Sequence, residues 1–339
     1  MTKDLSFPAR IHGGADPQGT PLHDFSSNRN ACGPCPQALA AVAQADATQY
    51  PDASYTALRR QLAIFHGVQV QRIVLATSAS EFIFRITAVL ARQGGQRVYA
   101  PPHSYGDYAQ AARAHGLQMT ADPAHAALRW ACDPSSPLGS AQEGLQALTQ
   151  PSAAITVLDR AYEPLRLSGT LALDAQQLQT VWQLYTPNKA LGLTGVRAAY
   201  AIAPLGSCAQ VDTLNQLCPS WPLGAHGVAM LQAWVSPAVQ AWLTGSLASL
   251  RDWKLQQVAL CESLGWHCQP SCANFFCAQP ALPTTMTLQQ ALEHLRQQGI
   301  KLRDTASFGL PGHVRISVQP PAVQAELMQA WQQLTGARA

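Results

Sequence analysis

The chain has 339 residues, of which 47% are hydrophobic and 12% charged, and its formal net charge is +3. This composition is typical of a compact globular protein and excludes an intrinsically disordered one. Because the charge is small and lysines and arginines do not gather in runs, the sequence argues against a nucleic-acid-binding surface. No apolar stretch is long enough for a membrane span, and the first residues lack the apolar core of a signal peptide. We therefore expect a cytoplasmic protein that binds neither nucleic acid nor membrane.

Residues 1–35 are rich in Gly, Pro, His and Asn and are predicted to form an arm rather than a core element. After it, helices and short strands alternate. Apolar spacing predicts helices at 37–47, 54–66, 81–91 and 106–115, and strands at 72–76, 97–100, 128–132, 155–158, 180–185 and 197–202. This alternation is typical of a mainly parallel sheet with helices on both faces. In such a sheet the ligand lies at the carboxyl ends of the strands.

The pattern changes near residue 236. One long helix, or a pair of helices, is predicted over 239–264, followed by a strand at 274–278, a helix at 288–298, a strand at 314–318 and a helix at 322–334. We interpret this part as a smaller α+β domain. The predicted organisation is thus an arm over 1–35, which packs with the small domain, a large domain over 36–235 and a small domain over 236–339.

The nine cysteines are odd in number and irregular in spacing, which predicts reduced thiols. Cys32-Gly33-Pro34-Cys35 has the letters of a redox dithiol, but a polar stretch stands where the motif needs a buried strand. The cysteines at 268, 272 and 277 lack a clean second pair for zinc. We predict neither a redox motif nor a metal site.

Lys189 is one of four lysines and lies in a turn-like stretch between two predicted strands. Thr186 precedes it by three residues and Arg197 follows it by eight. A hydroxyl and a guanidinium beside a lysine could bind a phosphate group while the amine reaches an aldehyde. The ordinary alternative is a solvated loop lysine.

Asp159 and Tyr162 follow the strand predicted at 155–158, where side chains reach the ligand crevice. A carboxylate there could pair with a protonated pyridine nitrogen and so help the ring to accept electrons. Tyr162 could donate a hydrogen bond to the phenolic oxygen of the same ring. The structural alternatives are a turn residue and a packed aromatic.

Three further features suit an anionic, planar ligand. Ser78, Ala79 and Ser80 follow a strand and begin a helix, so their backbone N–H groups could bind a phosphate. Tyr105 follows the strand predicted at 97–100 and could stack on a ring. In the small domain, Arg303 and Arg315 suit a substrate carboxylate or phosphate, although exposed salt bridges would explain them equally well.

Together these residues resemble the fold-type I pyridoxal phosphate (PLP) enzymes of the aminotransferase class I/II group. The likeness is closest to the histidinol-phosphate aminotransferases and the threonine-phosphate decarboxylase-like proteins of cobalamin biosynthesis. It rests on the order of these features along the chain. The phosphate-binding residues Ser78, Ala79 and Ser80 come first, followed by the stacking Tyr105, the Asp-x-x-Tyr motif of Asp159 and Tyr162, Lys189, and Arg197 eight residues after the lysine. The further segments that resemble the family are His12-Gly13-Gly14, Asp24-Phe25-Ser26-Ser27-Asn28-Arg29-Asn30, Tyr50-Pro51-Asp52, Ala273-Asn274-Phe275-Phe276, Phe308-Gly309-Leu310-Pro311-Gly312 and Arg315-Ile316-Ser317.

The resemblance implies a fold-type I large domain with a mainly parallel seven-stranded sheet and PLP bound as a Schiff base on Lys189. It implies a homodimer with shared active sites, since Tyr50 would reach the cofactor phosphate of the partner subunit. The substrate-binding residues that it implies are His12, Asn30, Asn274, Arg303 and Arg315. Two positions depart from the family pattern. Ser136 replaces an asparagine that contacts the ring's phenolic oxygen, and Asn188 replaces a phosphate-binding Ser or Thr.

We predict an aminotransferase that acts on an amino acid or a phosphorylated amine, with Lys189, Asp159 and Tyr162 as its catalytic residues. The freed amine of Lys189 is the natural base for moving a proton from the substrate α-carbon. A decarboxylase acting on threonine phosphate is the first alternative, and the start at His12 favours it. A catalytically silent PLP-fold binding protein is the second, against which the retention of Lys189, Asp159 and Arg197 argues.

Overall fold

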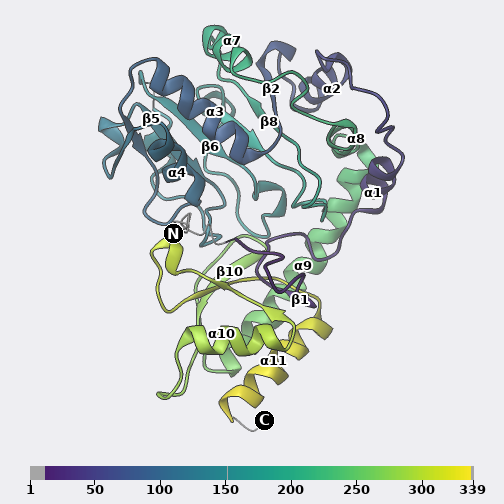
Figure 1. Ribbon diagram of the computed structural model, residues 1–339, viewed down its shortest axis with the longest axis vertical. Coiled ribbons are helices and arrows are strands. Elements are labelled where there is room, and N and C mark those ends of the chain that lie inside the picture. The colour runs from purple at the N-terminus through teal and green to yellow at the C-terminus, as the bar shows by residue number, and fades with distance from the viewer. Residues whose placement is uncertain (1–11, 151, 337–339) are drawn as a thin grey trace, which may run out of the picture.

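The computed structural model describes residues 12–150 and 152–336. Its larger lobe is built on a seven-stranded sheet in the order β2-β8-β7-β6-β5-β3-β4 (Figure 1). The strands are β2 (Ile73–Ala76), β8 (Ala199–Ile202), β7 (Trp182–Tyr185), β6 (Ile155–Asp159), β5 (Leu128–Cys132), β3 (Arg97–Tyr99) and β4 (Gln118–Thr120). β8 is antiparallel to both of its neighbours, and the other four pairings are parallel. The predicted mainly parallel seven-stranded sheet is confirmed.

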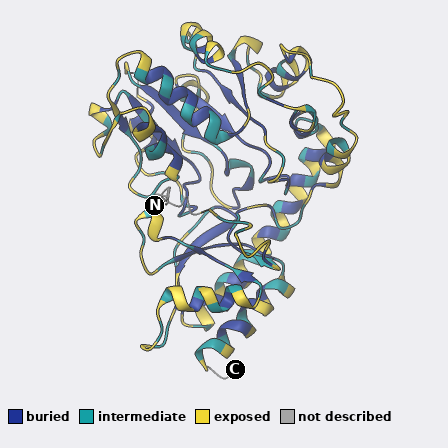
Figure 2. Cartoon of the chain, in the orientation of Figure 1, coloured by how far each residue is buried: buried dark blue, intermediate teal, exposed yellow. Residues whose placement is uncertain are grey.

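Helices cover both faces of this sheet, because successive side chains of each strand point to opposite sides. Ile73 and Leu75 pack in one cluster with α1 (Pro36–Ala43), α2 (Thr56–His66) and α8 (Ala225–Trp234). Val74 and Ala76 pack in the other with α3 (Ala79–Arg92), α4 (Gly106–Ala114) and α7 (Cys208–Gln216). The central strands are therefore buried on both faces, and Figure 2 shows them dark blue between the helices.

The smaller lobe holds a four-stranded antiparallel sheet in the order β12-β13-β10-β9. Its strands are β12 (Arg303–Asp304), β13 (Val314–Ser317), β10 (Phe275–Gln279) and β9 (His267–Cys268), and its helices are α9 (Pro237–Ser263), α10 (Leu288–Gln297) and α11 (Pro321–Thr335). Trp266, Phe276 and Trp331 belong to its core.

α9 is one continuous helix of 27 residues and not a pair. It starts after the N-cap Ser236, whose hydroxyl accepts a hydrogen bond from Val239 N. Leu243 on its first half belongs to the core of the larger lobe, and Cys261 near its end belongs to that of the smaller lobe. The helix therefore connects the two lobes (Figure 1). The predicted division at 235/236 coincides with the helix start and stays a prediction.

The described part of the N-terminal segment contacts both lobes. β1 (His23–Asp24) pairs in parallel with β11 (Ile300–Lys301), and Phe25 is fully buried in the core of the smaller lobe. Cys35 is fully buried in the core of the larger lobe. The segment predicted as an arm rather than a core element thus contributes apolar side chains to both cores, and its boundary at residue 35 stays a prediction.

The remaining elements are short: α5 (Leu145–Leu148), α6 (Ala175–Leu178) and the 3-10 turns Val70–Arg72, Pro123–His125, Glu163–Leu165 and Ala306–Phe308. No helix within residues 12–150 and 152–336 is long and apolar enough to cross a membrane.

Candidate active site

Asp159 is the last residue of β6 and is almost completely buried. Its Oδ2 accepts a hydrogen bond of 2.7 Å from the hydroxyl of Tyr108, and its Oδ1 accepts one of 2.9 Å from the backbone N–H of Ala161. Burial raises the pKa of the Asp159 carboxyl, whereas these two donors and the nearby Lys189 ammonium lower it. The strand end therefore presents a desolvated carboxylate that is fixed in direction.

Lys189 follows β7 and is half-buried, and its Nζ lies 5.2 Å from the centre of the Tyr162 ring. The structure thus brings together the lysine, aspartate and tyrosine that were predicted from separate segments. The N-terminal segment holds the backbone of this loop. Asn30 N donates to Lys189 O at 2.9 Å, Asn30 Nδ2 donates to Ala190 O at 3.1 Å, and Cys35 N donates to Leu191 O at 2.9 Å.

Asn30 was predicted to bind substrate, but the structure commits its side chain to the fold. Besides Ala190 O, its Nδ2 donates to the Ser246 hydroxyl at 2.8 Å, and its Oδ1 accepts from Cys32 N at 3.0 Å. Every polar atom of the Asn30 amide is therefore engaged, and Asn30 fixes the Lys189 loop against α9.

Asn188 has a related structural part in the loop. Its Oδ1 accepts a hydrogen bond of 2.9 Å from the Thr186 hydroxyl, and its Nδ2 donates to Thr194 O and Val196 O at 3.4 Å each. Both Thr186 and Asn188 are buried. The amide thus braces the turn that carries Lys189, which a serine or threonine at this position could not do in the same way.

Tyr162 is buried between the two lobes. Its ring lies edge-to-face against Phe275 of β10, with 4.6 Å between the ring centres. Its hydroxyl accepts a hydrogen bond of 3.2 Å from Nδ2 of Asn28, a buried residue whose Oδ1 has no partner within the described part of the chain. Ser136, predicted beside the ring oxygen, is also buried, but no hydrogen bond joins it to Tyr162 among the described residues.

The predicted phosphate cradle lies at the start of α3. The Ser78 hydroxyl caps this helix by accepting from Glu81 N at 3.1 Å, and Ala79 is its first residue. The Ser80 and Tyr105 hydroxyls share a hydrogen bond of 3.1 Å. Because the Tyr105 ring lies 5.9 Å from the Tyr108 ring, edge-to-face, the cradle continues directly to the Asp159 site.

In the smaller lobe, Arg303 of β12 and Arg315 of β13 lie directly opposite each other, and both are buried. Their guanidinium carbons lie 4.8 and 5.7 Å from the centre of the Phe308 ring. Arg303 Nη2 donates to the Ser307 hydroxyl, and Arg315 Nη2 donates to Ser26 O at 2.8 Å. Burial, together with the charge of Arg315, lowers the pKa of Arg303 to about 10. Two like charges side by side favour an anion between them.

Asn274 precedes Phe275, the residue that connects Arg315 to Tyr162. Its Nδ2 donates to Arg29 O at 3.1 Å and its buried Oδ1 has no partner among the residues described. The next residue, Phe275, contacts both Tyr162 and Arg315. Side-chain contacts therefore run without a break from Tyr162 to the arginine pair.

Three predicted residues lie on the surface. His12 and Arg197 are exposed, and no hydrogen bond to their side chains is made within residues 12–150 and 152–336. Tyr50 is 79% exposed and stacks on Trp221, with ring centres 4.6 Å apart. No side-chain contact joins any of the three to Lys189 among the described residues, although the backbone just before Arg197 bonds to Asn188 through Val196 O.

Sequence reasoning missed Tyr108 and Asn28, which contact Asp159 and Tyr162. Tyr108 carried a usable signal, because it lies three residues after Tyr105 at a helix start and so points the same way. Asn28 carried none beyond its place in a polar segment, since its contact with Tyr162 spans 134 residues.

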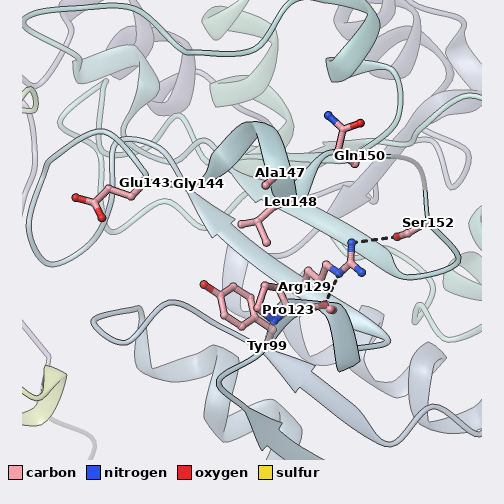
Figure 3. Close-up of a pocket in the computed structure, with 10 residues that line it drawn as sticks. Tyr99, Pro123, Arg129, Glu143, Gly144, Ala147, Leu148, Gln150 and Ser152 are labelled. Carbon is pink, nitrogen blue, oxygen red and sulfur yellow. Dashed lines mark hydrogen bonds between the residues drawn. The ribbon is translucent and has the colours of Figure 1, made fainter.

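A surface pocket of about 450 Å³ lies apart from this constellation and contains none of the predicted site residues. Arg129, the second residue of β5, crosses it and donates to Pro123 O and the Ser152 hydroxyl (Figure 3). Asp159 ends β6 and Lys189 follows β7, so these two charged groups lie at the carboxyl ends of central strands and mark the better candidate for the active site.

The family model for aminotransferase class I and II matches residues 20–333. The chain belongs to the aminotransferase class I and II family. This aminotransferase is 27% identical to the histidinol-phosphate aminotransferase of Jannaschia sp. (strain CCS1), over 97% of this chain and 94% of that protein. It is also 27% identical to the histidinol-phosphate aminotransferase of Symbiobacterium thermophilum, over 91% and 90%.

Solved structures agree with the aminotransferase fold. Histidinol-phosphate aminotransferase from Sinorhizobium meliloti, in complex with pyridoxal-5'-phosphate, superposes with a TM-score of 0.80 at 21% identity, over 95% of this chain and 93% of that one. The L-threonine-O-3-phosphate decarboxylase from Porphyromonas gingivalis gives 0.72 at 20% identity, over 87% and 94%. The predicted fold class and family are confirmed. The roles of single residues in this aminotransferase stay predictions.

Proposed function

We propose that this aminotransferase uses PLP, held covalently by Lys189, to transfer the amino group of a phosphorylated amine. The observation that carries the proposal is that the Lys189 amine, the buried Asp159 carboxylate and the Tyr162 ring lie together after β6 and β7. The relatives named for histidinol phosphate support the substrate class.

The residues present fit PLP. Each Asp159 oxygen receives one hydrogen bond and keeps a lone pair that the pyridine nitrogen could use. The backbone N–H groups at the start of α3 and the Ser80 hydroxyl suit the phosphate, with Arg197 as its counter-charge. The Thr186 hydroxyl would have to turn from Asn188 to reach the phosphate, because its one proton is donated to Asn188 Oδ1. Tyr105 would stack on the ring, and Ser136 would lie near its phenolic oxygen.

When bound, PLP would supply a ring that accepts electrons from the substrate. The protein's own groups do the rest. Lys189 would take the proton from the substrate α-carbon, Asp159 would keep the ring nitrogen protonated, and Tyr162 would donate to the ring oxygen. Arg303 and Arg315 would hold the substrate's phosphate or carboxylate, with Asn274 beside them.

The first test is covalent labelling of Lys189. Protein purified with PLP should absorb visible light, and borohydride should fix the cofactor on the peptide that contains Lys189. The Lys189→Ala variant should stay colourless, whereas Lys301→Ala, which removes a lysine bonded to Gly14 O and Asp16 in the smaller lobe, should keep the label. A colourless wild-type protein, or a label on another lysine, contradicts the proposal.

The second test separates transamination from decarboxylation, which the fold shared with the Porphyromonas enzyme keeps as an alternative. Histidinol phosphate with 2-oxoglutarate should yield glutamate. Release of carbon dioxide from threonine phosphate without a keto-acid acceptor would instead favour the decarboxylase.

We also propose that the enzyme is a homodimer in which Tyr50 serves the partner's site. Its support is the family resemblance and the exposure of the Tyr50–Trp221 pair, since burying exposed aromatic side chains in a subunit interface is favourable. A cytoplasmic location remains the prediction from composition.

A further inference from the structure

The carboxylate of Asp159 is in an environment that opposes its charge. The residue is 4% exposed and lies at the carboxyl end of β6, in register with Cys132 of β5 and Leu184 of β7. A buried carboxyl group tends to become protonated, because water no longer stabilises its charge. A protonated Asp159 would present a neutral acid to a pyridine nitrogen and would lose the ion pair.

The titratable groups that face Asp159 come from three elements. Tyr108 is on α4, Cys132 ends β5, and Lys189 is in the loop after β7. Burial raises the pKa of the Cys132 thiol well above its ordinary value, so it stays neutral and brings no charge. Lys189 is the cation, but its amine is the group that would bind PLP covalently. Of these three side chains, Tyr108 is therefore the one that continues to stabilise the carboxylate, together with the backbone N–H of Ala161.

Tyr108 is built rigidly into the core. It is fully buried, and its ring stacks on Trp130 of β5 with ring centres 4.4 Å apart and 8° between the planes. Burial and the neighbouring Asp159 raise the pKa of the phenol well above its ordinary value, so that Tyr108 keeps its proton and acts as donor. A phenylalanine would fill the same space, whereas a buried hydroxyl costs free energy unless it finds an acceptor. Here that acceptor is Asp159 Oδ2, at 2.7 Å.

We propose that Tyr108 is a positioning residue of this aminotransferase, which keeps Asp159 ionised and aimed at the ring nitrogen of the bound cofactor. The inference rests on the proposed function. With Tyr108 on Oδ2 and Ala161 N on Oδ1, the carboxylate cannot rotate, and one lone pair on each oxygen still faces other donors. A hydrogen bond to a charged acceptor is worth more than one between neutral groups.

The test compares two ligands on reconstituted enzyme: PLP, and its analogue with carbon in place of the ring nitrogen. The ratio of the two affinities reports the contact between Asp159 and the ring nitrogen. Both ligands use Lys189 and the phosphate site in the same way, so those contributions cancel in the ratio. Tyr108→Phe keeps the ring stack and removes only the hydroxyl. At about pH 6 we expect it to weaken PLP binding roughly ten- to hundredfold and to leave the analogue unchanged. At about pH 9 the ratio should recover, since the carboxyl, whose pKa rises in the variant, ionises again.

Tyr99→Phe is the matched control, because the Tyr99 hydroxyl on β3 bonds to no residue within the described ranges; it should leave both affinities unchanged. In an Asp159→Asn background, Tyr108→Phe should have no further effect on the ratio. If Tyr108→Phe weakens both ligands equally, or neither, the inference is overturned and Tyr108 is a packing residue. If wild-type protein binds no PLP at all, the proposed function itself fails.

Discussion

Asn188 is the residue whose interpretation the structure changes most. Its amide accepts from Thr186 and donates to Thr194 O and Val196 O, so it braces the turn before and after Lys189. We expect Asn188→Ser, which introduces the residue expected from the family resemblance, to destabilise the fold by about 1 kcal/mol, because the carbonyls of Thr194 and Val196 lose their amide donor. Thermal unfolding of the apoprotein measures this. Thr194→Ala keeps the carbonyl and should unfold like wild type; equal melting temperatures for Asn188→Ser and wild type would refute the bracing role.

At this scale the sequence predicted the chemistry of single positions better than their partners. Asp159, Tyr162 and Lys189 were found because each follows a strand that ends at the same edge of the sheet. Asn30 was assigned to substrate binding, yet its amide bonds are with residues 190 and 246. Such partners depend on how distant segments pack, and spacing along the chain carries no information about them.

Between elements, the contact of α2 with the sheet makes stability depend on pH. His66 ends α2, shares a hydrogen bond of 2.8 Å with the Tyr200 hydroxyl of β8, and lies against Tyr185 of β7. Burial, with the charge of Arg160, lowers the pKa of His66 to about 4. The unfolded state, with a histidine pKa near 6.5, therefore binds more protons between these values, and stability falls as the pH drops through this window.

Urea unfolding at about pH 7 and about pH 5 tests this dependence. Over that interval we expect His66 to account for about 2 kcal/mol of lost stability. His66→Gln keeps a polar side chain but does not titrate. Between these two pH values the free energy of unfolding of the variant should therefore fall by about 2 kcal/mol less than that of the wild type. The same loss in both proteins would show that His66 is not the group responsible.

Elements were predictable where burial is uniform. β5 was predicted with its observed bounds, Leu128–Cys132, because a strand buried on both faces reads as a short apolar run. β4 was missed, since Gln118 and Met119 are exposed at the sheet edge and give no such run. The antiparallel direction of β8 could not be predicted either, because apolar content does not encode strand direction.

For the whole molecule, the two lobes were predictable but their connection was not. Lys254, midway along α9, donates to Ser271 O and to Ala273 O at 2.9 Å, and the segment between them donates from Cys272 N to Gly139 O of the larger lobe. These hydrogen bonds join the two lobes next to Ser136 and Asn274. Their polar groups are scattered over 134 residues, which is why no local pattern revealed them.

Assembly is the last property of the whole molecule, and mixing two defective variants tests it. If the site combines Lys189 of one subunit with Tyr50 of the other, Tyr50→Ala and Lys189→Ala damage different halves of it. In a mixed dimer one site then receives both intact residues, and the other receives neither. With random pairing half of the dimers are mixed, so unfolding and refolding the two variants together should restore roughly a quarter of wild-type activity.

Each variant refolded alone is the control, and Lys189→Ala alone should have no activity. If Tyr50 instead served its own subunit, the mixed dimer would contain one site without Tyr50 and one without Lys189. The mixture would then never exceed the average of its parts. Sedimentation of the same samples shows whether dimers formed. If dimers form and activity is still not restored, the shared site is contradicted although the dimer exists. Exposure of Tyr50 in the single chain, 79%, is what a residue held ready for a neighbour requires.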